Sequence, residues 1–325
     1  MPEKSADIKR ILKLVIGTLV IAGLVFFIVR IVVRDWGEVR RYEWSLDLPM
    51  LFGSIAVGCI ATFLNSKVTQ NIFKAFGGNI PFSRFAFLMQ FANFGRYIPG
   101  KVAQIAGLLV FMKREGVPRV STLGAMAVFQ VLLIITAGVL GILLAGQEAF
   151  SRFTLNIPSW VFALIGLLGI IATIPPILKA LANKALTLMK RDPIGYEISF
   201  KDWAVAFLSL ALGWILYGLS FAMMTASITE LELSSFPFVG GAFILAFTIG
   251  WMVFISPGGL GVREGVLLLI LTAVFPSGVA GLVATAGRIW ILTVEAASLG
   301  IAAIVFKTIG CKAVSSFSSS CSSEK

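Results

Sequence analysis

The 325-residue chain contains no histidine, and only 13% of its residues are charged. The absence of histidine excludes Ser-His catalytic triads, histidine acid–base catalysis and histidine metal sites. Its three cysteines, Cys59, Cys311 and Cys321, have no CxxC spacing, so the sequence predicts neither a disulfide framework nor a zinc site. We therefore expect no metal and no cofactor, and we interpret the protein as not an enzyme.

Apolar residues replace the missing charges: 58% of the chain is hydrophobic and the mean hydropathy is +0.95. Because soluble domains carry about a quarter charged residues, this composition predicts an integral membrane protein. The net charge of +11 is the excess expected of cationic cytoplasmic loops. No basic-aromatic module is recognisable, so we expect no nucleic-acid partner.

Six apolar runs approach or exceed the roughly 20 residues that cross a bilayer. They are residues 14–33, 50–66, 121–145, 158–175, 203–228 and 279–306. The cations between the runs alternate in the order that six spans with both termini in the cytoplasm require. The exception is the loop 34–49, which is expected outside although it carries three arginines. We expect a multi-pass protein of a bacterial or archaeal plasma or inner membrane.

Two further apolar segments are each interrupted by Pro-Gly. Residues 82–112 break at QFANFGRYIPGKVAQ (90–104), and residues 236–275 break at SPGGLGVRE (256–264). The flanks of the first segment are basic and those of the second are not, so each segment is expected to enter and leave on one side, the first inside and the second outside. We interpret both as re-entrant helical hairpins, whose irregular backbone must be buried or line a wet cavity. The alternative is ordinary spans kinked by proline.

Each half of the chain then contains two spans, a hairpin and a third span, in opposite orientations. This pattern predicts an all-α membrane protein with about six transmembrane helices plus two re-entrant hairpins in an inverted-topology repeat. The repeats are residues 1–146 and 147–312, followed by a disordered low-complexity tail, 313–325. Interrupted segments at matching positions of two halves indicate a transport site near the bilayer midplane.

The two breaks combine groups that suit an anionic headgroup. Helices that restart after Pro99-Gly100 and after Pro257-Gly258-Gly259 direct free N–H groups at the breaks. The cations at the breaks are Arg96, Lys101 and Arg263. A guanidinium can grip two phosphate oxygens at once. Asn93, one turn before the first break, is expected to line the site, whereas Asn65, Gln90, Gln104 and Gln130 are expected to bond between helices.

Three more ionisable residues lie in or beside apolar runs: Glu264, Arg288 and Glu295. Glu264 either complements a helix dipole in a first turn or titrates as a coupling group. Arg288 and Glu295 are seven residues apart and so share a helical face. They either lock helices together as an ion-pair network, or supply a headgroup ligand and a coupling carboxylate.

The motifs NFGRYIPGKV (93–102) and SPGGLGVREG (256–265) resemble those of the flippase-like family, the membrane region of lysyl-phosphatidylglycerol synthases. The resemblance extends over nearly the whole chain and implies lipid translocation. The matching positions are Arg96, Tyr97, Pro99, Gly100 and Lys101, then Pro257, Gly258, Gly261, Arg263 and Glu264. It adds Tyr97 as a substrate-binding candidate. The chain has no room for a synthase domain, so we expect no aminoacyl transfer.

These observations predict a flippase that moves an anionic or headgroup-modified lipid, or a polyprenyl-phosphate lipid, by alternating access. The alternative is a non-catalytic membrane partner of a separate synthase or glycosyltransferase. An enzyme acting on lipid-linked sugar is disfavoured, because neither break carries an acidic DxD cluster or a metal-ligand set.

Overall fold

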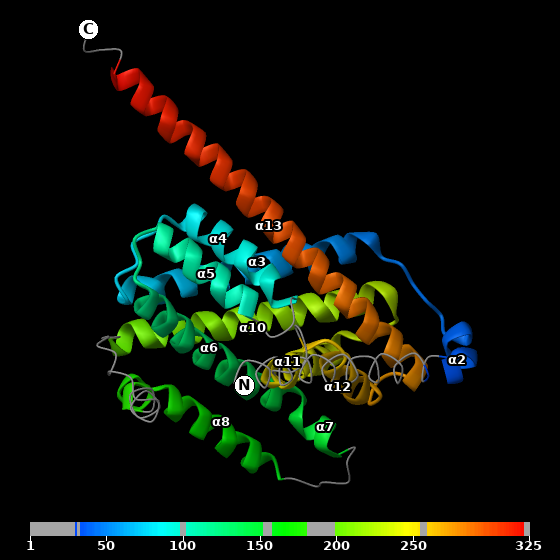
Figure 1. Ribbon diagram of the computed structural model, residues 1–325. Coiled ribbons are helices and arrows are strands. Elements are labelled where there is room, and N and C mark those ends of the chain that lie inside the picture. Colours follow the sequence, from blue (N-terminus) through cyan, green and yellow to red (C-terminus); the bar gives the residue numbers. More distant parts are fainter. Residues whose placement is uncertain are drawn as a thin grey trace, which may run out of the picture.

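The computed structural model describes residues 30, 33–97, 102–151, 158–180, 199–253 and 259–321. Within these ranges every regular element is a helix (Figure 1). The expected span 14–33 lies almost entirely outside the described residues. Seven residues of the predicted breaks also lie outside them: Ile98, Pro99, Gly100, Lys101, Ser256, Pro257 and Gly258.

The described helices differ widely in length, and short ones lie between the long ones. They are α2 (Trp36–Arg41), α3 (Leu48–Ala75), α4 (Phe82–Phe94), η1 (Gly95–Tyr97), α5 (Val102–Arg114), α6 (Arg119–Gly141), η2 (Ile142–Gly146), α7 (Gln147–Ser151), α8 (Ser159–Thr173), α10 (Phe200–Ile228), η3 (Leu233–Ser235), α11 (Phe236–Met252), α12 (Val262–Leu271) and α13 (Ser277–Cys321). The helix α13 runs into the low-complexity tail; disorder of residues 313–325 stays a prediction.

Five helical segments are long and apolar enough to cross a membrane: Leu48–Ala75, Arg119–Ala149, Phe200–Ile228, Leu233–Met252 and Ser277–Thr308. The protein is therefore a multi-pass membrane protein. The expected spans 50–66, 121–145, 203–228 and 279–306 lie within four of these segments. The fifth, Leu233–Met252, includes α11, which the sequence predicted as the first arm of a hairpin.

The expected span 158–175 is shorter in the structure. Its helix, α8, ends at Thr173 because Ile174 adopts an extended ψ of 135°. The cause is local: Ile174 precedes Pro175, and a residue before proline is driven out of the helical region.

Glycine determines where two helices of the first half end. Gly77 and Gly116 have φ values of 86° and 80°, the left-handed conformation that glycine adopts without strain. After α3, the N–H groups of Gly78 and Gly77 donate to the carbonyls of Phe73 and Lys74 at 2.8 and 3.0 Å. Residues 116–117 form the same pair of bonds after α5. These turns send the chain from α3 into α4 and from α5 into α6.

The segment before α3 is attached to the start of α13. Ser277 Oγ donates to Asp35 Oδ2 at 2.5 Å, and Arg34 Nε donates to the other oxygen at 2.8 Å. The pKa of the Asp35 carboxyl is lowered, first by the hydrogen bond from Arg34 and then by that from Ser277. This attachment holds α2 against α13.

Contacts between helices follow the same scheme in the two halves. In the first half, α3 contacts α4 and α6, while α5 contacts α4 and α6. In the second half, α10 contacts α11 and α13, while α12 contacts α11 and α13. Between the halves, α3 packs along α10, α4 and α3 contact α13, and α6 contacts α10 and α11 (Figure 1). The two halves are thus interleaved rather than set side by side.

Small residues allow the closest of these helix contacts. A Cβ atom added to Gly240 on α11 would lie 2.9 Å from the carbonyl of Gly218 on α10. In the reverse direction, a Cβ on Gly218 would lie 3.2 Å from the Gly240 Cα. Without a hydrophobic driving force between helices in lipid, such backbone approach provides the packing energy.

We expect Gly240→Leu to destabilise the protein, because the new side chain must push α11 away from α10. Overpacking of this kind costs about 1–3 kcal/mol. Thermal unfolding of purified protein in detergent measures the effect, and the melting temperature should fall by several degrees. The matched control is Gly300→Leu on α13, where an added Cβ meets no atom within 4 Å. Equal melting temperatures for the two variants would contradict the close packing of α10 on α11.

Candidate functional site

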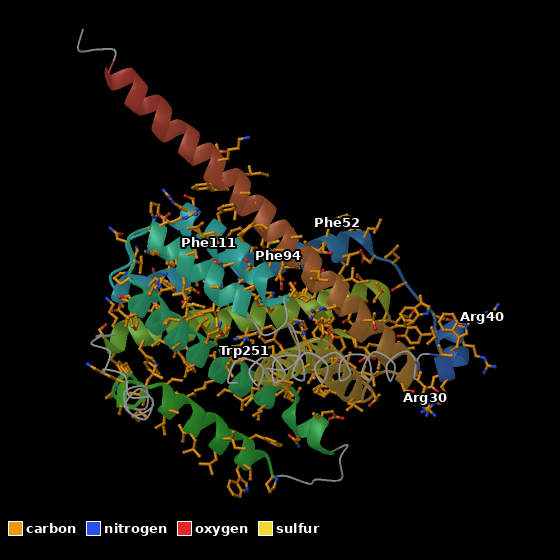
Figure 2. All side chains as sticks on the ribbon, in the orientation of Figure 1. Arg30, Arg40, Phe52, Phe94, Phe111 and Trp251 are labelled. Atoms are coloured by element: carbon orange, nitrogen blue, oxygen red, sulfur yellow. The ribbon has the colours of Figure 1, made fainter. Side chains whose placement is uncertain are left out.

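A cavity of about 410 Å³ lies where the two halves meet. Helices α3 to α6, with η1, line it from the first half, and α10 to α13 line it from the second. Its size falls within the roughly 300–1,000 Å³ of small-molecule pockets. Trp251 of α11, labelled near the centre of Figure 2, is one of its aromatic walls.

The first charged group in the cavity joins η1 to α13. Arg96 and Glu295 form an ion pair, with side-chain exposures of 24% and 9%. The Tyr97 hydroxyl donates to the other carboxylate oxygen of Glu295 at 2.8 Å. Both oxygens of Glu295 are therefore occupied, and the end of α4 is bound to a helix from the opposite half of the chain.

A second acid–base pair joins α12 to α13. Glu264 Oε2 accepts a hydrogen bond of 2.6 Å from the Gly261 N–H, which caps the start of α12. Its Oε1 lies 3.4 Å from Arg288 Nη1, an ion-pair distance, although this oxygen has no aligned hydrogen bond among the described residues. Glu264 thus makes the contact expected of a first-turn acid, and its titration stays a prediction.

Arg263 differs from the other two arginines. It is only 7% exposed, and no described carboxylate forms a salt bridge with it. Its guanidinium carbon lies 4.5 Å from the ring centre of Phe243 and 5.2 Å from that of Phe247. Aromatic faces attract a cation, but they replace only part of its lost hydration. An anion in the cavity would supply the missing counter-charge.

Glycines bring Arg263 to this position. Gly259 and Gly261 have φ values of 72° and 80°, which other residues adopt only with strain. A Cβ on Gly259 would lie 2.9 Å from the Gly250 carbonyl oxygen, and one on Gly250 would lie 2.9 Å from the Arg263 Cβ. The turn before α12 is therefore pressed against the end of α11.

The rest of the polar lining consists of neutral amides and hydroxyls. Gln104 Nε2 donates to Asn93 Oδ1 at 2.8 Å and so joins α5 to α4. Gln90 Nε2 donates to Ser66 Oγ at 2.9 Å and joins α4 to α3. These bonds match the interhelical role expected for Gln90 and Gln104.

The other two amides have no such partner. Asn65 Oδ1 and Gln130 Oε1 are buried without a hydrogen bond in the described part of the chain. Both residues line the cavity, and an interhelical bond from their side-chain nitrogens stays a prediction. The Asn65 oxygen lies beside α10, because a Cβ atom added to Gly213 of that helix would be 2.5 Å from it.

The structure brings most of the predicted site residues together. Asn93, Arg96, Tyr97, Arg263, Arg288 and Glu295 all line the cavity, and Glu264 contacts it through Arg288. Sequence reasoning did not assign the α3 wall. Thr62, Asn65, Ser66 and Thr69 lie there at spacings of three and four residues, which places polar groups on one face of an apolar helix. This spacing is the sequence pattern from which the polar face of α3 could have been predicted.

Comparison with known families accounts for the two motifs. The family profile described as the lysylphosphatidylglycerol synthase TM region matches residues 11–297. The chain belongs to this family. A search of curated proteins finds no match to this member of the TM-region family. Among its described residues, no group of three Cys, Asp or Glu side chains is placed to hold a metal ion.

In this TM-region protein we expect Arg96 and Glu295 to be energetically coupled. Removing one partner leaves the other charge poorly solvated, so Arg96→Gln and Glu295→Gln should each destabilise, while the double variant should cost less than their sum. Unfolding free energies from SDS titration in mixed micelles would give a coupling of about 2 kcal/mol.

The matched control is the pair Arg84–Glu115, whose atoms are 2.7 Å apart but whose arginine side chain is 50% exposed. An exposed pair should couple by less than about 1 kcal/mol. Similar coupling for the two pairs would contradict a special role for the cavity pair in joining η1 to α13.

Proposed function

We propose that this protein moves a lipid across the membrane by alternating access, and that the lipid carries an anionic or modified headgroup or a polyprenyl phosphate. The observation that carries the proposal is the convergence of Arg96, Arg263 and Arg288 on one cavity between the halves. Ionisable side chains inside membrane proteins are expensive and mark substrate pathways. Membership of the lysylphosphatidylglycerol synthase TM region adds a lipid context.

We further propose that α3–α6 and α10–α13 are inverted repeats. Exchanging α3 with α10, α4 with α11, α5 with α12 and α6 with α13 converts the observed helix contacts into one another. The contact of α4 with α13 becomes that of α11 with α6, and the contact of α3 with α13 becomes that of α10 with α6. Such paired contacts are what a pseudo-two-fold axis produces.

The two helix restarts support the same correspondence. The helix α5 begins with Val102 and has Gln104 as its third residue, and α12 begins with Val262 and has Glu264 third. Glutamine and glutamate at this position both suit a helix N-terminus. We therefore propose that α4–α5 and α11–α12 are the two hairpins, although α11 with η3 is also long enough to span.

In the proposed mechanism the headgroup meets Arg263 first and Arg96 second. A headgroup phosphate enters the cavity and binds Arg263, which lies against two aromatic rings and forms no salt bridge among the described residues. Arg96 is held by Glu295 across the halves, so a phosphate that competes for Arg96 loosens η1 from α13. The halves then rock about the cavity and release the headgroup on the other side, while the hydrophobic chains stay in lipid. No covalent step is part of this proposal. We also propose that both termini lie in the cytoplasm.

We expect Arg263→Gln to lower translocation at least tenfold with little loss of stability, because no salt bridge to a described carboxylate is lost with the arginine. The measurement is headgroup translocation in proteoliposomes, with a panel of fluorescent anionic and zwitterionic lipids and a polyprenyl phosphate. Melting temperatures in detergent report the fold. Arg84→Gln is the charge-matched control, since its ion pair lies outside the cavity lining, and it should translocate normally.

Two results would contradict the proposal. Normal translocation by a folded Arg263→Gln variant would exclude the cavity as the route. No movement of any lipid by folded wild-type protein would favour the alternative function, a non-catalytic partner of a separate synthase or glycosyltransferase. Co-purification with such an enzyme would then be the next measurement.

A further inference from the structure

The cavity presents two chemically different walls. One holds guanidinium groups from η1, α12 and α13, and the other holds neutral amides from α3, α4, α5 and α6. A bare phosphate would use only the first wall. The amides of the second wall need an explanation of their own, because a buried polar group without a hydrogen bond costs free energy.

The charges leave no acid for a cationic headgroup. Glu295 is engaged by Arg96 and by the Tyr97 hydroxyl, and Glu264 by the Gly261 N–H and Arg288. The three arginines and two glutamates carry a net charge of one positive unit. That balance suits a phosphodiester, which carries one negative charge. An ammonium group on the headgroup would meet arginines instead of a free carboxylate.

The amide wall is suited to hydroxyl groups. Asn65 and Gln130 have side-chain oxygens without hydrogen-bond partners among the described residues. The bond from Gln104 to Asn93 uses one polar atom of each amide. An amide both donates and accepts, as a hydroxyl does, so several amides on one wall can bind adjacent hydroxyls.

Resting on the proposed function, we propose that the transported headgroup is a phosphodiester joined to a neutral, hydroxyl-rich group. Arg263 binds the phosphodiester, and Asn65 and Gln130 bind the hydroxyls. Two lipid sources carry this chemistry: a glycerophospholipid with a polyol headgroup, and a polyprenol linked through phosphate to a sugar. An aminoacylated headgroup is disfavoured by the same cavity.

The test is equilibrium binding to the full chain in detergent by native mass spectrometry. Lipids with matched acyl chains differ only in headgroup: phosphatidic acid, phosphatidylglycerol, phosphatidylinositol, phosphatidylethanolamine and lysyl-phosphatidylglycerol. A glycosyl phosphoprenol and its polyprenyl phosphate form the second arm. We expect each hydroxylated diester to bind about fivefold tighter than the plain phosphate of its own arm, as one or two added hydrogen bonds predict.

The variants Asn65→Leu and Gln130→Met remove the amides at similar size. Each should weaken binding of the hydroxylated lipids about fivefold and leave binding of the plain phosphates unchanged. Using both variants guards against one that fails to fold. The matched control is Ser298→Ala, which should change nothing. It removes a buried hydroxyl that has no partner among the described residues and does not line the cavity.

Tightest binding of the lysyl lipid, or equal loss for plain and hydroxylated lipids in the variants, would overturn the inference. Preference within either arm supports it, and the arm with the tighter ligand identifies the lipid source. Binding with this preference but without translocation would refute the proposed function alone. Translocation of every lipid without headgroup preference would refute the inference alone.

Discussion

Pairing of charges inside the membrane is the constraint on which the centre of this protein depends. An isolated ion in a low-dielectric interior is so costly that each one must find a partner. Arg96 meets Glu295, and Glu264 meets Arg288. The first pair joins η1 to the long helix α13, and the second joins the start of α12 to the same helix. The requirement for counter-charge therefore brings η1 and the start of α12 to one helix, beside the cavity that all three line.

Arg263 is the exception that gives the cavity its chemistry. The same helix start that positions Glu264 for capping directs Arg263 toward Phe243 and Phe247, and no described carboxylate forms a salt bridge with it. Aromatic faces hold the guanidinium in place without neutralising it. The result is a preorganised cation whose free energy falls when an anion arrives, which is the property that a binding site for a lipid phosphate needs.

Some helix faces pack tightly against a neighbouring helix, whereas others line the cavity. Gly218 and Gly240 let α10 and α11 touch, and Gly250 and Gly259 press the turn before α12 against α11. On α3, by contrast, polar residues face the cavity. The oxygens of Asn65 on α3 and of Gln130 on α6 are buried without partners among the described residues. Glycine contacts hold the helices close together, whereas polar side chains of α3 line the space between the two halves.

The sequence by itself determined the membrane class, four of the long helices and the family, because hydropathy, glycine placement and short motifs are local properties. It also predicted Arg96, Arg263, Arg288 and Glu295 as site residues, since ionisable groups in apolar segments are conspicuous. Only the tertiary structure decided their partners: Arg96 and Glu295 are 199 positions apart, and no pattern in the chain specifies that contact. The same holds for Asn65 and Gln130, whose sequence context fits a helix contact equally well. Whether an amide meets a neighbour or a cavity depends on how helices from both halves pack.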